Sequence, residues 1–200
     1  MIKQEIEGNL TILTLDRPDK ANALTADMLA ALRDAVRAAS DQNALILTGV
    51  GKVFSAGADL EAAKAGLATS PLWEELSAAI AEYRGLSIAA LNGTVAGGAF
   101  GMVLTCDLRI AVPSAKFFYP VMKLGFLPQP SDPVRLRMLV GSQSAKRILM
   151  AGEKLTAQEA LDINLVDHLV ECDVVAKAKD LACDALAAKH SHVAAIKAMI

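Results

Sequence analysis

Two segments of small residues have the pattern expected of a site that polarises a carbonyl group. They are Val53–Leu60 (VFSAGADL) and Leu91–Gly101 (LNGTVAGGAFG), and in each a predicted strand ends in a glycine and alanine turn that opens a helix. Amides in the first turn of a helix have no intrahelical acceptor and carry the positive end of the helix dipole. Two such turns aimed at one point favour a carbonyl oxygen that gains negative charge, and small side chains let the ligand reach the backbone.

A glycine pair before a helix also has a purely structural explanation, which is close packing of the helix against the preceding strand. Gly97-Gly98 does not form the GxGxxG pattern of dinucleotide-binding proteins, and no phosphate-loop lysine follows it. Spacing alone therefore leaves both interpretations open: an anion or carbonyl site, or tight packing.

Strand and helix patterns alternate over the first two thirds of the chain. Strands are predicted at 3–7, 10–15, 44–47, 88–91, 108–112 and 116–119, and helices at 25–39, 71–83 and 98–106. Helices dominate from Asp132 onward, with starts at Asp132, at Ser142 or Ser144, at a Thr156/Glu159 capping box, at Asp173 and at Ser191; one strand is predicted at 166–170. This order predicts an α/β fold with a helical C-terminal portion. We expect one domain over residues 1–200, with a core to about residue 140 and a helical region at 141–200.

Composition argues against several classes of protein. The net charge is −2, which does not favour nucleic acid or an anionic membrane surface as a partner. The longest apolar stretch, Ile88–Leu104, is interrupted by glycines, and the charged N-terminus has no apolar signal core. We expect a cytoplasmic protein. Cys106, Cys172 and Cys183 lie among apolar residues and are predicted to be buried free thiols, and His190 and His192 lack the spacing of a helical metal pair, so no metal site is expected.

Taken in order along the chain, the motifs resemble the crotonase superfamily of enoyl-CoA hydratases and isomerases. The resemblance rests on Leu15–Leu24 (LDRPDKANAL), Phe54–Leu60, Asn92–Gly101 with Cys106-Asp107, and Lys123–Pro128 (KLGFLP), and it covers about residues 3–200. It implies a crotonase-like spiral of ββα units with a helical trimerisation region. The implied ligand is an acyl-CoA thioester, with coenzyme A as part of the substrate and no separate cofactor.

The resemblance assigns an oxyanion hole to the backbone amides of Ala58 and Gly98. It places ten further residues along the substrate: Lys20, Ala21, Ala23, Ala56, Asp59, Leu60, Gly97, Gly101, Val121 and Gln129. The segment Lys20–Leu24 resembles the part that lines the adenine and pantetheine end. Lys20 is placed to reach a CoA phosphate, although an exposed lysine after Pro-Asp is equally expected in a solvated turn, and both interpretations stay open.

The family's acid and base positions hold no carboxylate in this chain. Hydratases of the family use two glutamates, and the matching residues here are Gly101 and Val121; isomerases and dehalogenases use a carboxylate where this chain has Gln129. Hydration needs a proton acceptor for water and a donor for the α-carbon, so ordinary two-glutamate hydration is not expected.

Four other residues are alternative sources of a proton. Asp132 precedes Pro133 at a helix start, which predicts a helix N-cap. Glu74 and Glu75 are expected to be exposed helix charges, and the strand position of Tyr119 favours a packing role over proton donation.

Two hypotheses from different classes therefore remain. The first is an enzyme of fatty acid metabolism, a lyase or isomerase, that stabilises a thioester enolate with atypical acid/base groups. The second is a non-catalytic acyl-CoA binder or partner subunit that has lost the chemistry. Family members usually continue beyond the point that matches Ile200 with helices that pack in the trimer. Here the predicted helices at 173–188 and 191–200 are expected to provide the surface for a homotrimer or a dimer of trimers.

Overall fold

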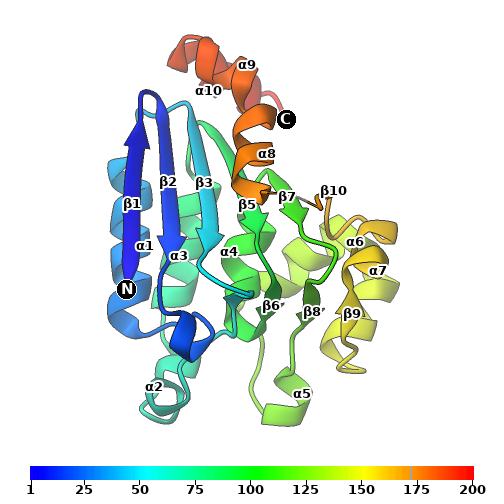
Figure 1. Ribbon diagram of the computed structural model, residues 1–200. Helices are drawn as coiled ribbons and strands as arrows, with labels where there is room; N and C mark the ends of the chain where they lie inside the picture. Colours follow the sequence, from blue (N-terminus) through cyan, green and yellow to red (C-terminus); the bar gives the residue numbers. More distant parts are fainter. Residues whose placement is uncertain (172) are drawn as a thin grey trace.

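The computed structural model describes residues 1–171 and 173–200 (Figure 1). Its strands form a six-stranded sheet in the order β1-β2-β3-β5-β7-β10 and a four-stranded sheet in the order β4-β6-β8-β9. Cys172, one of the cysteines predicted to be a buried thiol, lies outside the described residues.

Three successive strand pairs give the fold its spiral form. In each pair the first strand joins the six-stranded sheet and the second joins the four-stranded sheet. The pairs are β3 (Ala44–Gly49) with β4 (Val53–Ser55), β5 (Leu86–Leu91) with β6 (Thr94–Ala96), and β7 (Leu108–Ala111) with β8 (Lys116–Phe118). Helices follow each pair: α2 (Leu60–Lys64) and α3 (Leu72–Ala81), then α4 (Phe100–Thr105), then α5 (Val121–Leu124) and α6 (Asp132–Leu149). The predicted α/β spiral of ββα units is confirmed.

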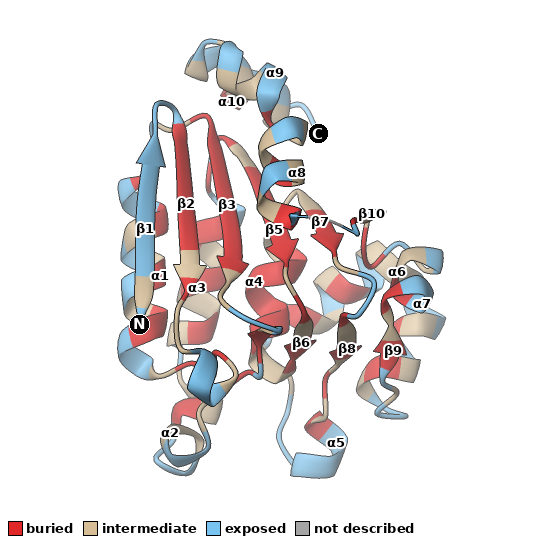
Figure 2. Ribbon diagram, in the orientation of Figure 1, coloured by how far each residue is buried: buried red, intermediate tan, exposed pale blue. Residues whose placement is uncertain are grey.

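The large sheet is buried on both faces because most side chains of its central strands are apolar. In β3, Leu45 and Leu47 face one apolar cluster, whereas Ala44 and Ile46 face another, as the two-residue period of a strand requires. Helices α1 (Ala26–Ala38), α3 and α4 cover the first face, and α8 (Val174–Leu181) covers the second (Figures 1 and 2).

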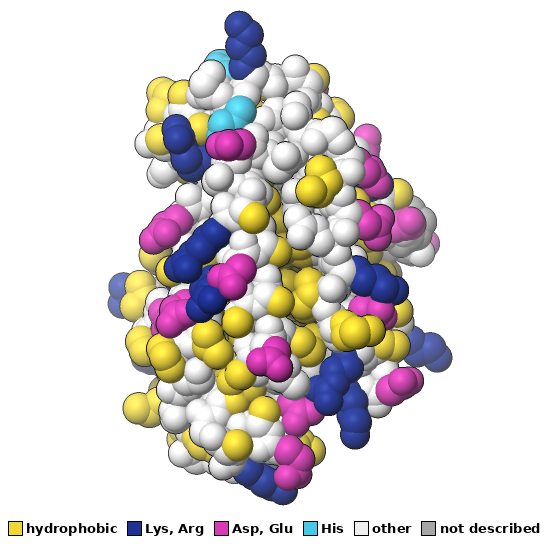
Figure 3. All heavy atoms as spheres, turned by 90° about the vertical axis from the view of Figure 1, so that its left-hand side faces the viewer, with side chains coloured by type: hydrophobic (Ala, Val, Ile, Leu, Met, Phe, Trp, Pro, Cys, Tyr) yellow, Lys and Arg dark blue, Asp and Glu magenta, His cyan; other side chains and the backbone are white. Residues whose placement is uncertain are grey.

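An antiparallel hairpin forms the edge of this sheet. β1 (Ile2–Glu7) pairs with β2 (Leu10–Leu15) through a turn in which Gly8 has φ +59°. β1 is largely exposed, and Lys3 and Glu7 form ion pairs with Asp16 and Lys179. Charges of both signs are interspersed over the face on this side of the molecule (Figure 3). Such charged edge strands resist pairing with another chain.

Two predictions for the C-terminal portion are confirmed by cap geometry. Thr156 and Glu159 form the capping box of α7 (Ala157–Asp162), and Asn164, just past the helix end, is left-handed with φ +63°. Within α6, Gly141 has non-helical dihedral angles, so a new helical segment starts beside Ser142 as expected.

Other predictions for this portion are wrong in detail. The strand predicted at 166–170 is only β10 (His168–Leu169), and the helix predicted at 173–188 is divided into α8 and α9 (Cys183–Ala187), although no glycine or proline marks the break. Ser191 is not a cap, because α10 (His190–Lys197) already includes it and follows Lys189 without a side-chain cap. Cys183 is exposed rather than buried, whereas Cys106 is a buried free thiol. The short strands β6 (Thr94–Ala96) and β9 (Leu155–Thr156) have no counterpart among the predicted strands.

A sharp turn at Asn92-Gly93 carries the chain from the large sheet to the small one. Asn92 accepts a hydrogen bond from the Gly49 amide at 3.0 Å and donates one to the Gly51 carbonyl at 2.9 Å, so this turn lies against the turn between β3 and β4. A Cβ at Gly93 would be 2.0 Å from the Lys52 carbonyl oxygen. Only glycine fits there without a backbone shift. No helix in the described part of the chain is long and apolar enough to cross a membrane.

We predict that Gly93→Ala lowers the free energy of unfolding by about 3 kcal/mol or more, because the clash is with main-chain atoms. Gly152→Ala is the matched control: its φ of +65° strains an alanine, but nothing lies within 4 Å of the new Cβ. It should cost only about 1–2 kcal/mol. Chemical denaturation of both variants measures the difference, and equal losses would contradict the account of this turn.

Candidate functional site

The first of the two turns runs from β4 to α2 and is held by buried polar contacts. Ser55 is fully buried; its hydroxyl donates to the Asn22 carbonyl at 2.9 Å and accepts from the Gly57 amide at 3.1 Å. Gly57 has φ +89°. Asp59 is the N-cap of α2 and accepts hydrogen bonds from the amides of Glu61 and Ala62, as such caps do. The turn is therefore fixed at both of its ends.

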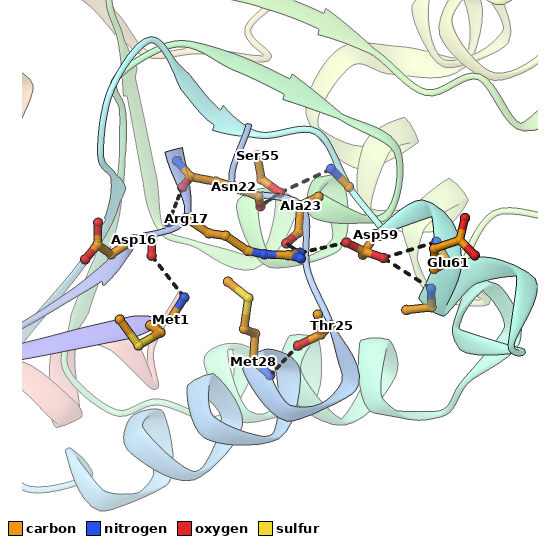
Figure 4. A network of polar contacts seen from close by, with 12 residues as sticks. Met1, Asp16, Arg17, Asn22, Ala23, Thr25, Met28, Ser55, Asp59 and Glu61 are labelled. Carbon is orange, nitrogen blue, oxygen red and sulfur yellow. Dashed lines mark hydrogen bonds and ion pairs between the residues drawn. The ribbon is translucent and has the colours of Figure 1, made fainter. Parts of the chain in front are cut away.

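A network around Arg17 ties this turn to the end of β2 (Figure 4). The Arg17 guanidinium donates to the Ala23 carbonyl at 3.0 Å and to the Asp59 carboxylate at 2.7 Å. This ion pair, followed by the Ala62 amide, holds the pKa of Asp59 below its usual range. Asn22 accepts from the Arg17 amide, and its own amide group donates to the Val53 carbonyl at 2.7 Å. Arg17 thus positions the turn that contains Ala58.

The second turn runs from β6 to α4 through the 3₁₀ helix η3 (Gly97–Ala99), where the sequence predicted a helix beginning at Gly98. Gly97 is left-handed with φ +56°, which suits glycine. The Trp73 ring packs on Gly98, since a Cβ there would be 3.0 Å from it, and the Trp73 indole donates to the Leu67 carbonyl at 2.7 Å. Glycine at position 98 therefore leaves the space that the Trp73 ring occupies.

Parallel pairing of β4 with β6 brings the two turns together. Val53 pairs with Thr94 and Ser55 with Val95, so both strands deliver their turns to the same edge of the small sheet. A Cβ at Gly57 would be 2.8 Å from the Ala96 carbonyl oxygen and 3.4 Å from the Gly98 nitrogen. The turns are in main-chain contact, and glycine at position 57 is what permits it.

The amides of Ala58 and Gly98 lie in these two turns. Ala58 forms an isolated parallel bridge to Leu24 through the amide of Asp59 and the carbonyl of Gly57, which leaves the Ala58 amide without an acceptor among the described residues. Gly98 lies in the first turn of a 3₁₀ helix that has no side-chain cap among the residues described, and such amides have no intrahelical acceptor.

A mostly apolar cavity of about 310 Å³ opens in front of the two turns. Its walls come from both turns, from α2, from the 3₁₀ helix η2 (Leu67–Thr69), from α3 and from the chain around α5. They are Ala56, Ala58, Leu60, Ala63, Lys64, Ala68, Trp73, Gly97, Gly98, Tyr119, Pro120, Val121, Leu124, Phe126, Leu127 and Gln129. A larger cavity of about 850 Å³ lies between α10 and the strands β5 and β7, but it contains neither turn. The smaller cavity is therefore the candidate site.

Beside the turns, Asp132 is buried with 1% of its surface exposed. Its Oδ2 accepts a hydrogen bond from the Tyr119 hydroxyl at 2.9 Å, and its Oδ1 has no partner among the described residues. Burial is the main cause that raises the pKa of Asp132 to about 6; the Tyr119 hydrogen bond opposes this and the nearby Glu74 adds to it. The predicted N-cap role of Asp132 is wrong, because Ser131 takes the cap position and the carboxylate points into the core.

Comparison with known proteins shows which family this chain belongs to. The family model described as enoyl-CoA hydratase/isomerase matches residues 5–200. The chain belongs to this family. It is 37% identical over 176 residues to a crotonyl-CoA hydratase of Syntrophomonas wolfei, covering 84% of this chain and 68% of that protein. It is 33% identical over 192 residues to a short-chain-enoyl-CoA hydratase of Clostridium acetobutylicum, covering 89% and 72%. A crystal structure of an enoyl-CoA hydratase/isomerase from Pseudoalteromonas atlantica superposes with a TM-score of 0.90 at 30% identity, covering 99% and 81%.

In this family member the structure gathers most of the predicted site residues but not all. Seven line the cavity: Ala56, Ala58, Leu60, Gly97, Gly98, Val121 and Gln129. Asp59 caps α2 behind it, and Gly101 is buried beneath it against Asp132 and Ser77. Lys20, Ala21 and Ala23 are not in the wall; Ala21 accepts a hydrogen bond from the Ala56 amide, and Lys20 is exposed.

The predicted acid/base positions have structural partners of their own. Gln129 donates from its side chain to the Ala68 carbonyl at 3.1 Å, and Val121 is buried at the start of α5. Glu74 accepts from Ser131, and Glu75 pairs with Arg33; both glutamates are half-buried rather than exposed. No acidic side chain lines the cavity in the part of the chain that the structure describes.

Sequence reasoning missed several cavity walls. Trp73, Phe126 and Leu127 were not among the predicted substrate residues. Phe126 and Leu127 lie within the Lys123–Pro128 motif, whereas Trp73 comes from a helix face outside every motif. The sequence did contain a signal for Asp132, which is an acid beside proline at a helix start. The positions where the family has carboxylates hold neutral residues in this chain, and glycine at position 101 leaves room for another side chain.

The raised pKa of Asp132 predicts a pH-dependent stability. Between its ordinary pKa near 4 and about 6, the unfolded chain has lost the Asp132 proton and the folded chain still holds it, so stability falls as pH rises through this window and levels above it. Asp132→Asn removes this loss. We therefore expect the variant to gain up to about 3 kcal/mol on the wild type between pH 4 and pH 7. Urea unfolding at several pH values measures this, and a difference that does not change with pH would contradict it.

Proposed function

We propose that this chain binds an acyl-CoA thioester in the cavity and polarises its carbonyl with the amides of Ala58 and Gly98. The observation that carries the proposal is the main-chain contact between the two turns: Ala58 and Gly98 both line the cavity, and their amides have no acceptors among the described residues. Two fixed donors aimed at a developing oxyanion lower the barrier to enolate formation, and they need no reorganisation during the reaction.

The cavity lining supports a thioester with an apolar acyl group. Leu60, Leu124, Phe126 and Leu127 supply the apolar surface, and Lys64 is the one basic side chain in the wall formed by described residues. The relatives named above are hydratases of crotonyl-CoA and short-chain enoyl-CoA, which agrees with a small acyl group. We further propose that Lys20, Ala21 and Ala23, at the outer side of the first turn, lie along the CoA portion.

The reaction is proposed to be enolate chemistry other than two-glutamate hydration. Gly101 and Val121 carry no carboxylate, and the Gln129 side-chain amide donates a hydrogen bond to the Ala68 carbonyl. None of the three residues therefore acts as a base. A non-catalytic acyl-CoA binder is the second candidate, favoured by the lack of an acidic side chain in the described cavity wall.

Other properties follow as proposals from family membership. They are a single domain over residues 1–200, a cytoplasmic location, and a homotrimer or dimer of trimers without nucleic acid or membrane partners. Exposed apolar side chains at Met122, Leu124, Leu127 and Met138 support self-association on the side of α5 and α6.

Two substitutions at Gly98 test the amide directly. Gly98→Pro removes the N–H at a 3₁₀ position, where the fixed φ of proline is acceptable, and Gly98→Ala is the matched control. Both variants press a Cβ against Trp73, but only alanine keeps the donor. We predict that Gly98→Pro turns over acyl-CoA about 10²–10³-fold more slowly than Gly98→Ala. Equal rates would contradict the assignment.

The assay separates the two candidate functions. Turnover of crotonyl-CoA, a 3-enoyl-CoA and malonyl-CoA is measured beside calorimetric binding of the same ligands. Binding with no turnover of any of them would favour the non-catalytic binder, and no binding would overturn both.

A further inference from the structure

The buried carboxylate of Asp132 occupies the space of a side chain that position 101 lacks. A Cβ at Gly101 would be 3.1 Å from Asp132 Oδ1 and 2.7 Å from Ser77 Oγ. The two positions are therefore coupled: glycine at 101 makes room for an acid that arrives from α6 instead of α4. An ionisable group this deeply buried costs stability unless it has partners, and its Oδ1 has none among the described residues.

Tyr119 links this carboxylate to the cavity. Tyr119 lines the cavity together with Gly98, and its hydroxyl donates to Asp132 Oδ2 at 2.9 Å. The hydroxyl also accepts from the Gln129 amide at 3.3 Å, and the ring stacks on Phe100 with centroids 5.3 Å apart. These contacts hold the phenol beside the carboxylate, in a residue that also lines the proposed thioester site.

Burial raises the pKa of Asp132 to about 6, and the groups around it shift this pKa in both directions. Glu74 faces it from α3 and disfavours the carboxylate, whereas Arg135 on its own helix and the Tyr119 hydroxyl favour it. Burial also raises the pKa of Tyr119, so the phenol is neutral and retains its proton. A carboxylate whose pKa is near neutral pH can accept a proton through a neutral phenol that is hydrogen-bonded to it. No free phenolate forms in such a transfer.

We infer that Tyr119 and Asp132 form the proton shuttle for the α-carbon of the bound acyl-CoA. The inference rests on the proposed function. The α C–H bond breaks as its proton passes to Tyr119 Oη, while the proton of Tyr119 passes to Asp132 Oδ2. The electron pair moves into the thioester carbonyl, where the Ala58 and Gly98 amides stabilise the oxyanion. Reversal returns a proton to the α-carbon or, in an unsaturated chain, to the γ-carbon. Tyr119 is the catalytic residue, and Asp132 is the positioning residue that acts through it.

Exchange of α-protons for deuterium tests this shuttle without assuming the overall reaction. The probe is butyryl-CoA in D₂O, followed by NMR, because a saturated chain undergoes only enolate formation and its reversal. We expect wild-type exchange to rise with pH through about 6, since the carboxylate is the active form. Tyr119→Phe should slow exchange by about 10²–10⁴-fold, and Asp132→Asn should both slow it and remove the rise with pH.

Tyr83→Phe is the matched control. Tyr83 is the other tyrosine of the chain, is equally buried, and donates a hydrogen bond to the Gln42 carbonyl away from the cavity. It should exchange at the wild-type rate. Calorimetric binding of butyryl-CoA by every variant shows that the fold and the pocket are retained.

The outcomes are distinguishable. Wild-type exchange by Tyr119→Phe, or a pH rise that persists in Asp132→Asn, would overturn the shuttle. Binding by the wild type without any exchange would overturn the shuttle and leave acyl-CoA binding standing. No binding by the wild type would overturn the proposed function itself.

Discussion

The parallel pairing of β4 with β6 is the interaction on which the candidate site depends. It forces two strand-to-helix turns, about forty residues apart along the chain, to end at the same edge of the small sheet. Glycine at position 57 lets the two backbones touch, Gly97 adopts the left-handed conformation of the second turn, and Trp73 packs into the space left at Gly98. The large sheet and its helices hold this pairing in place, because each ββα unit passes one strand to each sheet.

Much of this arrangement could be predicted from the sequence because its determinants are local. Strand alternation, the Thr156 capping box, the left-handed Asn164 and the glycine turns are all expressed within a few residues. The motif order then supplied the family and the spiral. The helix boundaries near Ala182 and Lys189 were not predictable, since an alanine-rich segment has nearly uniform helix propensity and tertiary contacts decide where it breaks.

The chemistry beside the turns depends on contacts that no local pattern expresses. Asp132 has the sequence context of a helix cap, yet the missing side chain at Gly101 and the hydroxyl of Tyr119 draw its carboxylate inward. The acid, the phenol and the glycine come from three different elements. Position-by-position comparison with the family pattern finds three neutral residues there, whereas the folded chain places a carboxylate within reach of the same region. The family pattern thus shows which positions lack a carboxylate, whereas the folded structure is needed to show that the Asp132 carboxylate lies beside Gly101.

The most direct test of the account is the infrared stretching frequency of the thioester carbonyl, measured with a ¹³C-labelled acyl-CoA bound to the protein. Hydrogen bonds from two fixed amides polarise the C=O bond and weaken it. The account predicts that the band moves to lower frequency on binding and returns toward the solution value in Gly98→Pro. A bound carbonyl with the same frequency as in solution would contradict the claim that the two turns form a site for it.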